Sequence, residues 1–137
     1  AESLLFATLD TTARRTRLPH GTDAILTDTV GFLRDLPRGL LDAFRSTLEE
    51  LVESCLLIHV VDISAEDWEE RQEAVIATLG SLGATEIPRL TLWNKSDLVD
   101  RGAFLPLARK RRAHLVSVHD KADRSRVRHL IEGAVRA

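Results

Sequence analysis

The chain has 137 residues, of which 44% are hydrophobic and 29% are charged, and its formal net charge is −2. This length and balance predict one domain with a core of its own, and the charge argues against a general polyanion binder. The single cysteine, Cys55, excludes a disulfide framework and favours a reducing compartment, and no signal peptide or membrane-spanning apolar stretch is visible, so a cytoplasmic location is expected.

Apolar runs and helical stripes alternate along the chain. Two strands, around residues 14–18 and over 24–27, are joined by a predicted turn at 19–21. The spacing then predicts a helix over 41–52, a strand over 55–61, a helix over 68–82, a strand over 89–93, a weaker helix over 102–111, a strand over 113–116 and a helix over 127–135. The strand runs are nearly continuously apolar, which favours a parallel sheet buried on both faces in an α/β fold.

Polar residues collect where the predicted strands end, which is where ligands bind in such folds. The sharpest motif, Asn94-Lys95-Ser96-Asp97, directly follows the strand over 89–93. A carboxylate at Asp97 can accept hydrogen bonds from the ring N–H and the exocyclic amine of guanine, a donor pair that adenine lacks. Asn94 can tie neighbouring loops together, and the stem of Lys95 can lie along the base. The alternative is a loop of turn-forming polar residues.

Two segments nearer the start could serve a phosphate. Asp28-Thr29-Val30-Gly31 follows the strand over 24–27: Asp28 can hold Mg²⁺ through water, and Gly31 leaves a backbone N–H open to a phosphate. Phe6-Ala7-Thr8-Leu9-Asp10 offers the Thr8 hydroxyl as a second Mg²⁺ ligand. Read alone, the first motif is also ordinary turn chemistry and the second a terminal loop.

The strand over 113–116 ends at Ser117-Val118-His119, whose backbone N–H groups could reach a base oxygen. His119 as a general base is a minor alternative, and no catalytic residue is assigned. His59 is expected to be a core residue whose ring nitrogens are hydrogen-bonded, and Asp62 a strand-end cap. The sequence contains no metal-binding spacing of Cys and His and no nucleophile elbow.

The order of these motifs is a threonine loop, strand-Asp-x-x-Gly, strand-Asn-Lys-x-Asp and strand-Ser. It resembles the order of the switch and base-reading loops of P-loop GTPases, and the resemblance covers essentially the entire chain. More specifically, the chain resembles the HflX family of ribosome-associated GTPases. The resemblance lies in residues 5–12 (LFATLDTT), 26–37 (LTDTVGFLRDLP) and 41–50 (LDAFRSTLEE).

The resemblance implies a GTPase-type layered sheet with helices on both faces, GTP and Mg²⁺ binding, and slow hydrolysis stimulated by the large ribosomal subunit. It also implies a role in separating or rescuing stalled ribosomes. Thr8 and Asp28 would serve Mg²⁺, the stretches 6–10 and 28–31 would contact the nucleotide, and 94–97 with 117–119 would hold guanine. Phe32 stands where many GTPases place a water-orienting glutamine, so hydrolysis would need another group or a partner. A monomer is expected, with the oligomeric state left open.

Three departures from the family matter. Val118 stands where a small residue is usual, and Ala13 where a third threonine is common. No Gly-rich segment ending in Lys-Ser or Lys-Thr occurs, and no methionine is present, so we expect an N-terminally truncated GTP-binding domain over residues 1–137 that lacks its first strand and phosphate loop. The strand that feeds this loop lies mid-sheet in the family. Its absence would leave two apolar strand edges unpaired, favour aggregation and make the isolated chain inactive.

Two competing interpretations remain. From residue 101 to the end there are ten Lys or Arg and three Asp or Glu. The chain could therefore be a non-catalytic GTPase-like module that docks on the ribosome or on RNA through the residues 109–112, Arg124, Arg126 and Arg128. Two solvated helical faces are the simpler explanation of that charge. A phospho-receiver domain would need clustered strand-end acids with an opposing lysine, and the sequence shows neither.

Overall fold

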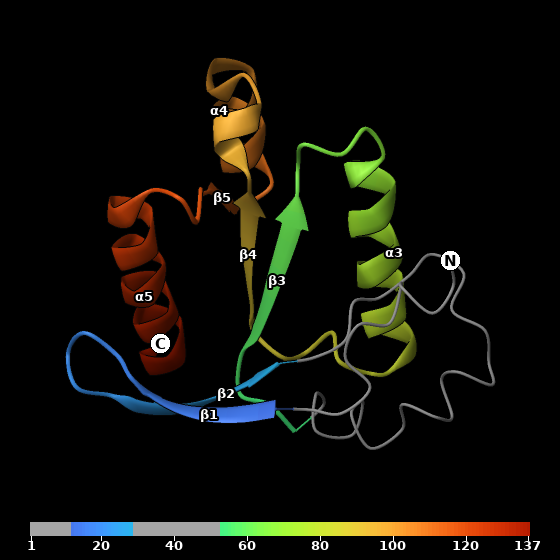
Figure 1. Ribbon diagram of the computed structural model, residues 1–137. Coiled ribbons are helices and arrows are strands. Elements are labelled where there is room, and N and C mark those ends of the chain that lie inside the picture. The colour runs from blue at the N-terminus through green and yellow to red at the C-terminus, as the bar shows by residue number, and fades with distance from the viewer. Residues whose placement is uncertain (1–11, 29–52) are drawn as a thin grey trace.

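The computed structural model describes residues 12–28 and 53–137 (Figure 1). The predicted helix over 41–52, the segment 6–10 and the motif residues 29–31 lie outside the described residues. For Asp28 the backbone alone is described.

An antiparallel hairpin opens the described part. Strands β1 (Thr12–Arg17) and β2 (Asp23–Asp28) pair so that Thr12 lies opposite Asp28 and Arg17 opposite Asp23. Gly21 has a φ of 92°, a conformation that glycine adopts without strain. The Leu18 N–H donates to the Thr22 carbonyl at 2.8 Å and closes the turn. The predicted strands and the turn at 19–21 are confirmed.

A parallel sheet of three strands forms the centre of the molecule. Strands β3 (Leu57–Asp62), β4 (Arg89–Asn94) and β5 (Ala113–Leu115) lie in the order β3-β4-β5. In the register, Leu57 is opposite Arg89 and Asp62 opposite Asn94, so β3 and β4 end together. The predicted strands over 55–61, 89–93 and 113–116 are confirmed, with shifts of one or two residues at their ends.

In the described residues three α-helices accompany the sheet: α3 (Trp68–Ser81), α4 (Arg101–Lys110) and α5 (Lys121–Arg136), with a short 3₁₀ helix η2 (Ser96–Leu98) after β4. The helices predicted over 68–82 and 102–111 agree to within one residue at each end. Helix α5 begins earlier than residue 127, because the Asp120 side chain accepts hydrogen bonds from the N–H groups of Ala122 and Asp123 at 2.8 and 3.4 Å. No helix in the described part is long and apolar enough to cross a membrane.

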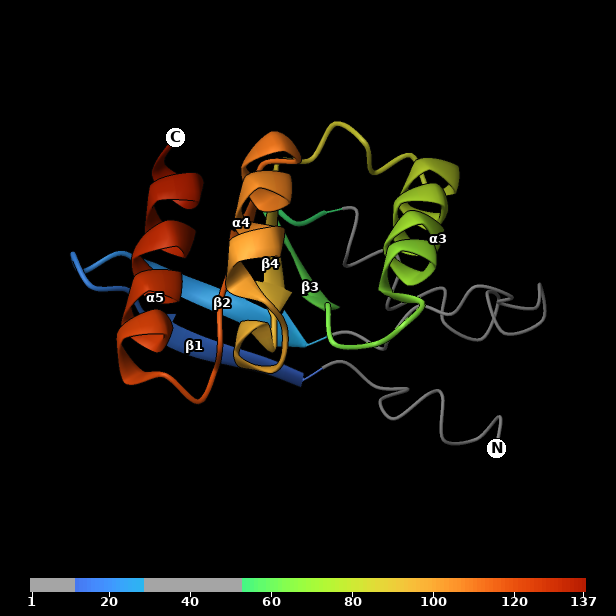
Figure 2. The same ribbon diagram turned by 90° about the horizontal axis from the view of Figure 1, so that it is seen from above.

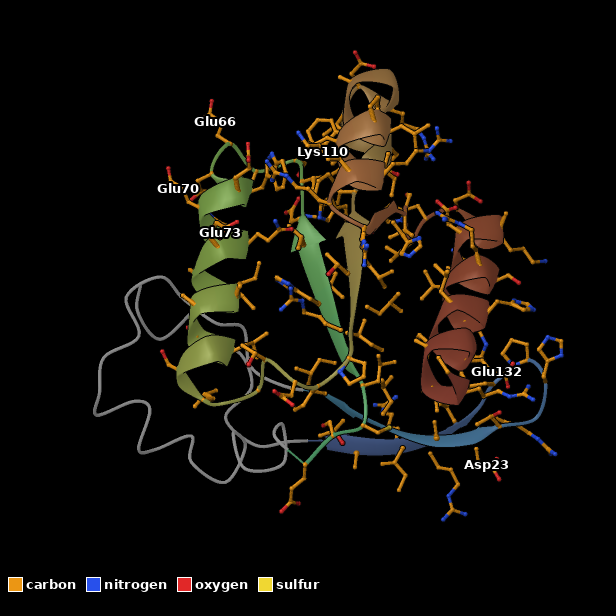
Figure 3. All side chains as sticks on the ribbon, turned by 180° about the vertical axis from the view of Figure 1, so that it is seen from behind. Asp23, Glu66, Glu70, Glu73, Lys110 and Glu132 are labelled. Atoms are coloured by element: carbon orange, nitrogen blue, oxygen red, sulfur yellow. The ribbon has the colours of Figure 1, made fainter. Side chains whose placement is uncertain are left out.

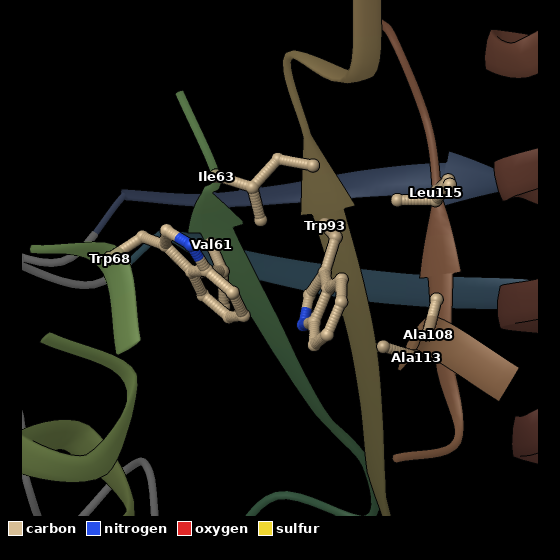
Figure 4. Close-up of a cluster of buried hydrophobic side chains, with 7 residues drawn as sticks. All are labelled: Val61, Ile63, Trp68, Trp93, Ala108, Ala113 and Leu115. Atoms are coloured by element: carbon tan, nitrogen blue, oxygen red, sulfur yellow. The ribbon is translucent and has the colours of Figure 1, made fainter. Parts of the chain in front are cut away.

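The core has two sides because the side chains of each strand alternate. On one side the fully buried Trp93 packs with Trp68, Val61 and Leu115, and Phe104 of α4 lies against them (Figure 4). On the other side, residues of β4 and α5 pack together with Val116, which directly follows β5: Leu90, Leu92, Val116, Val127, Leu130 and Ile131. Helices therefore cover both faces of the sheet, and α3 and α5 stand on opposite sides of β3 and β4 (Figure 2). The predicted α/β class is confirmed.

The described strands form two separate sheets. Strand β2 pairs only with β1 and strand β3 only with β4 among the described residues. Apolar side chains on β2 and β3 are accessible: Ile25 is 68% exposed, Leu26 51% and Val60 59%. Within the described residues, β2 and β3 therefore each have a single strand partner, and the expected missing strand between them stays a prediction.

Candidate functional site

The loop after β4 is held rigidly and directs one carboxylate outward. Lys95 adopts a left-handed conformation with φ 66°, which turns the chain sharply after Asn94. Ser96 is fully buried: its N–H donates to the Val116 carbonyl at 3.1 Å, and its hydroxyl accepts from Arg101 at 3.1 Å. Asp97 follows as an exposed residue. The buried serine fixes the loop, so the Asp97 carboxylate is presented to solvent in a defined place.

Two hydrogen bonds join this loop to the loop after β5. The Asn94 Oδ1 accepts from the Val118 N–H at 3.3 Å, and the Asp97 Oδ1 accepts from the Ser117 hydroxyl at 2.9 Å. The two motifs lie 20 to 24 residues apart in sequence. The parallel strands place them side by side at the end of the sheet where β4 and β5 finish.

Between the two loops lies a cavity of about 250 Å³. Its lining is Asn94, Lys95, Asp97, Leu98, Ser117, Val118 and His119. Apart from Leu98, these are all residues that the sequence motifs had singled out. Pockets for drug-sized ligands run from about 300 to 1,000 Å³, so this cavity is smaller than such pockets.

Three further residues support the cavity: Asp123 and Leu98 were not found from the sequence, and Arg124 was named there only as a candidate RNA-docking residue. The Asp123 carboxylate accepts from the Ser117 N–H at 2.9 Å, and Arg124 donates to the Val118 carbonyl at 2.7 Å. Leu98 contributes an apolar wall and is 65% exposed. The Asp120-x-x-Asp123 spacing is a helix-start signal that could have placed Asp123 beside the loop.

Asp62, at the end of β3, connects the third strand to the same loop. Its Oδ1 accepts from the N–H of Ser64 at 3.0 Å and from its hydroxyl at 2.6 Å, while its Oδ2 pairs with the Lys95 ammonium at 3.0 Å. Burial raises the pKa of Asp62, but the hydrogen bonds from Ser64 and Lys95 outweigh it and lower the pKa below its usual value. The expected strand-end cap is confirmed, and the contact with Lys95 is an addition.

The phosphate-side residues are not brought to this cavity by the described part of the chain. Residues 6–10 and 29–31 lie outside it, and β2, which ends at Asp28, belongs to a hairpin lying across the end of the sheet where β3 begins (Figure 1). Among residues 12–28 and 53–137 no three His, Cys, Asp or Glu side chains form a metal-binding group. The Mg²⁺ roles of Thr8 and Asp28 stay predictions.

The two histidines considered from the sequence lie in different settings. His119 lines the cavity and is exposed. His59 lies in β3 and is half-buried, and its Nδ1 is buried with no hydrogen-bond partner among the described residues, so the expected hydrogen-bonded core histidine is not what this part of the chain shows. Burial, with the positive charge of Arg89, lowers the pKa of His59 to about 4, so its ring is neutral near pH 7.

Open α/β sheets bind their ligands at the carboxyl ends of the strands, and the cavity lies at that end of this sheet. The sequence profile described as "50S ribosome-binding GTPase" matches residues 1–95. The protein named GTPase HflX from Caldanaerobacter subterraneus subsp. tengcongensis is 52% identical over 99 residues, which are 72% of this chain and 23% of that protein.

Two further proteins named GTPase HflX are similar to this chain in sequence. That of Alkalihalophilus pseudofirmus is 42% identical over 135 residues, 98% of this chain and 31% of its own length. That of Escherichia coli strain K12 is 43% identical over 100 residues, 73% of this chain and 24% of its own. The chain therefore belongs to the HflX family of GTPases. It spans between 23% and 31% of the length of these three relatives.

Proposed function

We propose that this chain supplies the guanine-binding part of an HflX-type GTPase. The observation that carries the proposal is the exposed Asp97 carboxylate at the cavity between the two loops. One of its oxygens is held by the Ser117 hydroxyl at 2.9 Å, which orients the group. An oriented carboxylate can accept from the N1–H and the 2-amine of guanine, and adenine offers no such pair.

The other groups of the cavity suit the rest of a purine. In the loop at 117–119 the N–H groups of Ser117 and Val118 already donate to Asp123 and Asn94, which leaves the His119 N–H as the candidate donor to the guanine O6. The Lys95 ammonium is drawn towards Asp62, so the aliphatic stem of Lys95 is the part available to lie against the base.

The proposed reaction is hydrolysis of GTP by the intact protein, with Thr8 and Asp28 contributing hard oxygen ligands to Mg²⁺. Because the described residues contain no group of three metal ligands, phosphate oxygens and water would complete the shell of that ion. Phe32 cannot orient the attacking water, so we expect slow intrinsic hydrolysis and stimulation by a partner.

We propose the large ribosomal subunit as that partner, with separation or rescue of stalled ribosomes in the cytoplasm as the outcome. The family description "50S ribosome-binding GTPase" supports this partner. For the 137-residue chain alone we expect no measurable hydrolysis, because its sequence contains no Gly-rich segment ending in Lys-Ser or Lys-Thr to hold the phosphates.

The test is Asp97→Asn in the intact protein, with binding of fluorescent GTP and XTP measured side by side. The asparagine amide donates where the carboxylate accepted. GTP affinity should therefore fall by about a hundredfold or more, while XTP, whose C2 carries oxygen, should gain. Glu73→Gln, an exposed acid-to-amide change on α3, is the matched control and should leave both affinities unaltered. Unchanged GTP binding by the Asp97 variant would refute the proposal.

A second candidate function rests on a separate surface. A groove of about 300 Å³ between α4 and α5 is lined by Arg101, Arg109 and Arg126, with Asp123 the acidic residue in its wall. Such a surface fits a non-catalytic module that docks on RNA through phosphate contacts. It predicts RNA binding that weakens in Arg109→Gln and with salt, in a wild-type protein that binds no GTP. Tight GTP binding would favour the first function.

A further inference from the structure

Helix α5 carries a buried carboxylate that accepts hydrogen bonds from the turn of the β1–β2 hairpin. Glu132 is 2% exposed. Its Oε1 accepts from the His20 N–H at 2.8 Å, and its Oε2 accepts from the Thr22 N–H at 3.2 Å. These partners are 112 and 110 residues away in sequence. Figure 3 shows Glu132 on the part of α5 nearest the hairpin, close to Asp23 at the start of β2.

Burying a carboxylate costs free energy unless hydrogen bonds satisfy its oxygens. The buried Glu132 therefore needs these N–H partners in the hairpin turn. Burial raises the pKa of Glu132, but the hydrogen bonds from His20 and Thr22 lower it below the usual value, so the group is ionised at neutral pH. Arg128, one helical turn earlier, donates to the Arg17 carbonyl. The rings of His20 and His129 meet edge to face at 5.7 Å. The turn is thus fastened to α5 by several contacts.

The opposite end of α5 contacts the loop at 117–119, which lines the cavity. Asp123, in the first turn of the helix, accepts from the Ser117 N–H, and Arg124 donates to the Val118 carbonyl. One helix therefore contacts the loop at 117–119 at its beginning and the hairpin turn near its end. An α-helix is stiff over this length because each turn is hydrogen-bonded to the next.

The hairpin has a particular place in the chain. Strand β1 begins at Thr12, two residues after the segment 6–10, and β2 ends at Asp28, the first residue of the motif at 28–31. The six-residue pairing makes the hairpin one unit, and the two segments continue the chain from its two strands.

We propose that Glu132 is a positioning residue of the GTPase: it fixes the hairpin between the two phosphate-side segments to α5, and α5 couples them to the base cavity. This inference rests on the proposed function of the segments 6–10 and 28–31. In this proposal α5 is the rigid element that links the hairpin turn to the loop at 117–119. GTP has a γ-phosphate that GDP lacks, and the segments flanking the hairpin are proposed to contact it. We therefore expect the affinity for GTP to depend on Glu132 more than the affinity for GDP does.

The experiment compares wild type, Glu132→Ala and Glu132→Gln in the intact protein, with Arg136→Ala, an exposed change in the last turn of α5, as the control. GTP and GDP affinities are measured with Mg²⁺, and hydrogen exchange is followed at the amides of His20 and Thr22. In Glu132→Ala we expect the ratio of GTP to GDP affinity to drop about fivefold or more, with faster exchange at both amides. Glu132→Gln keeps one acceptor oxygen and should fall between, and the control should match wild type.

The outcomes separate the two claims. If wild type binds neither nucleotide, the proposed function fails and this inference falls with it. If wild type binds GTP, and the alanine variant exchanges faster at His20 and Thr22 while its affinity ratio is unchanged, Glu132 is merely structural and the inference is wrong. If the alanine variant does not fold, the glutamine variant decides by the same ratio: a shift supports the inference and no shift overturns it.

Discussion

The cavity and the interior of this molecule use polar groups in opposite ways. At the cavity the charged side chains stay accessible: Asp97 is exposed, and the Lys95 side chain is 48% exposed, whereas the neutral Ser117 is buried. In the interior Gln72 is 6% exposed and Glu132 is 2% exposed, and both are hydrogen-bonded to protein groups. Exposed pairs contribute about 0–1 kcal/mol each, whereas a buried group left unpaired costs about 1–3 kcal/mol. The accessible groups can therefore serve a ligand, while the buried ones hold the fold.

The largest expected effect is in the interior, at Trp93. Its indole N–H donates to the Gln72 Oε1 at 2.9 Å, and its ring packs on Trp68 at 4.8 Å. Trp93→Phe removes the donor and leaves a void, so urea unfolding should show a loss of roughly 3 kcal/mol. Base selection should not change.

A double variant is the control for Trp93. Adding Gln72→Leu to Trp93→Phe removes the unsatisfied amide and should restore part of the stability. The contrast between interior and cavity does not hold if Trp93→Phe lowers the free energy of unfolding by less than Lys95→Met, the cavity change described below.

The next effect is a pH dependence due to His59. Its folded pKa, about 4, lies below the unfolded value of 6.5, so the unfolded chain takes up a proton first as the pH falls. Stability is therefore complete above pH 6.5 and declines towards pH 4, with a loss on the order of 2 kcal/mol at pH 5. Urea unfolding at pH 8 and pH 5 measures it. His59→Phe should reduce the difference, and an equal difference in both proteins would show that His59 does not cause it.

The smallest expected effect is at the cavity. Lys95→Met keeps the apolar stem but breaks the pair with Asp62, whose Oδ2 lies 3.0 Å from the ammonium. The change in stability should be about 0.5 kcal/mol or less and should vanish in high salt, since both groups are accessible. GTP affinity should fall only a few-fold if the stem is what contacts the base. A loss as large as that of Asp97→Asn would show that the charge matters instead.

Local patterns in the sequence predicted most of the described elements. Continuous apolar runs predicted β3, β4 and β5, and stripes at helical spacing predicted α3 and the later part of α5. A weaker helix was expected where α4 lies. The start of α5 was misplaced because the polar first turn of this helix shows no apolar stripe, and its capping residue Asp120 was not recognised. The cavity motifs were found because each follows directly on a strand.

Contacts between distant parts of the chain were beyond the reach of such patterns. Glu132 reads as one charge on an amphipathic helix, and nothing local distinguishes it from a solvated residue. It is buried only because the hairpin turn, 110 and 112 residues away, lies against it. Asp123 likewise has its role from the Ser117 N–H that it faces.

The sequence by itself determined the α/β class, the strand-end motifs and the membership in a GTPase family, because hydrophobic periodicity and motif spacing act over a few residues along one chain. Only the tertiary structure decided that the loops at 94–97 and 117–119 share one cavity and that α5 joins this cavity to the hairpin turn. The physical reason is that hydrogen bonding and burial depend on which surfaces meet after folding, and this depends on the packing of all elements together.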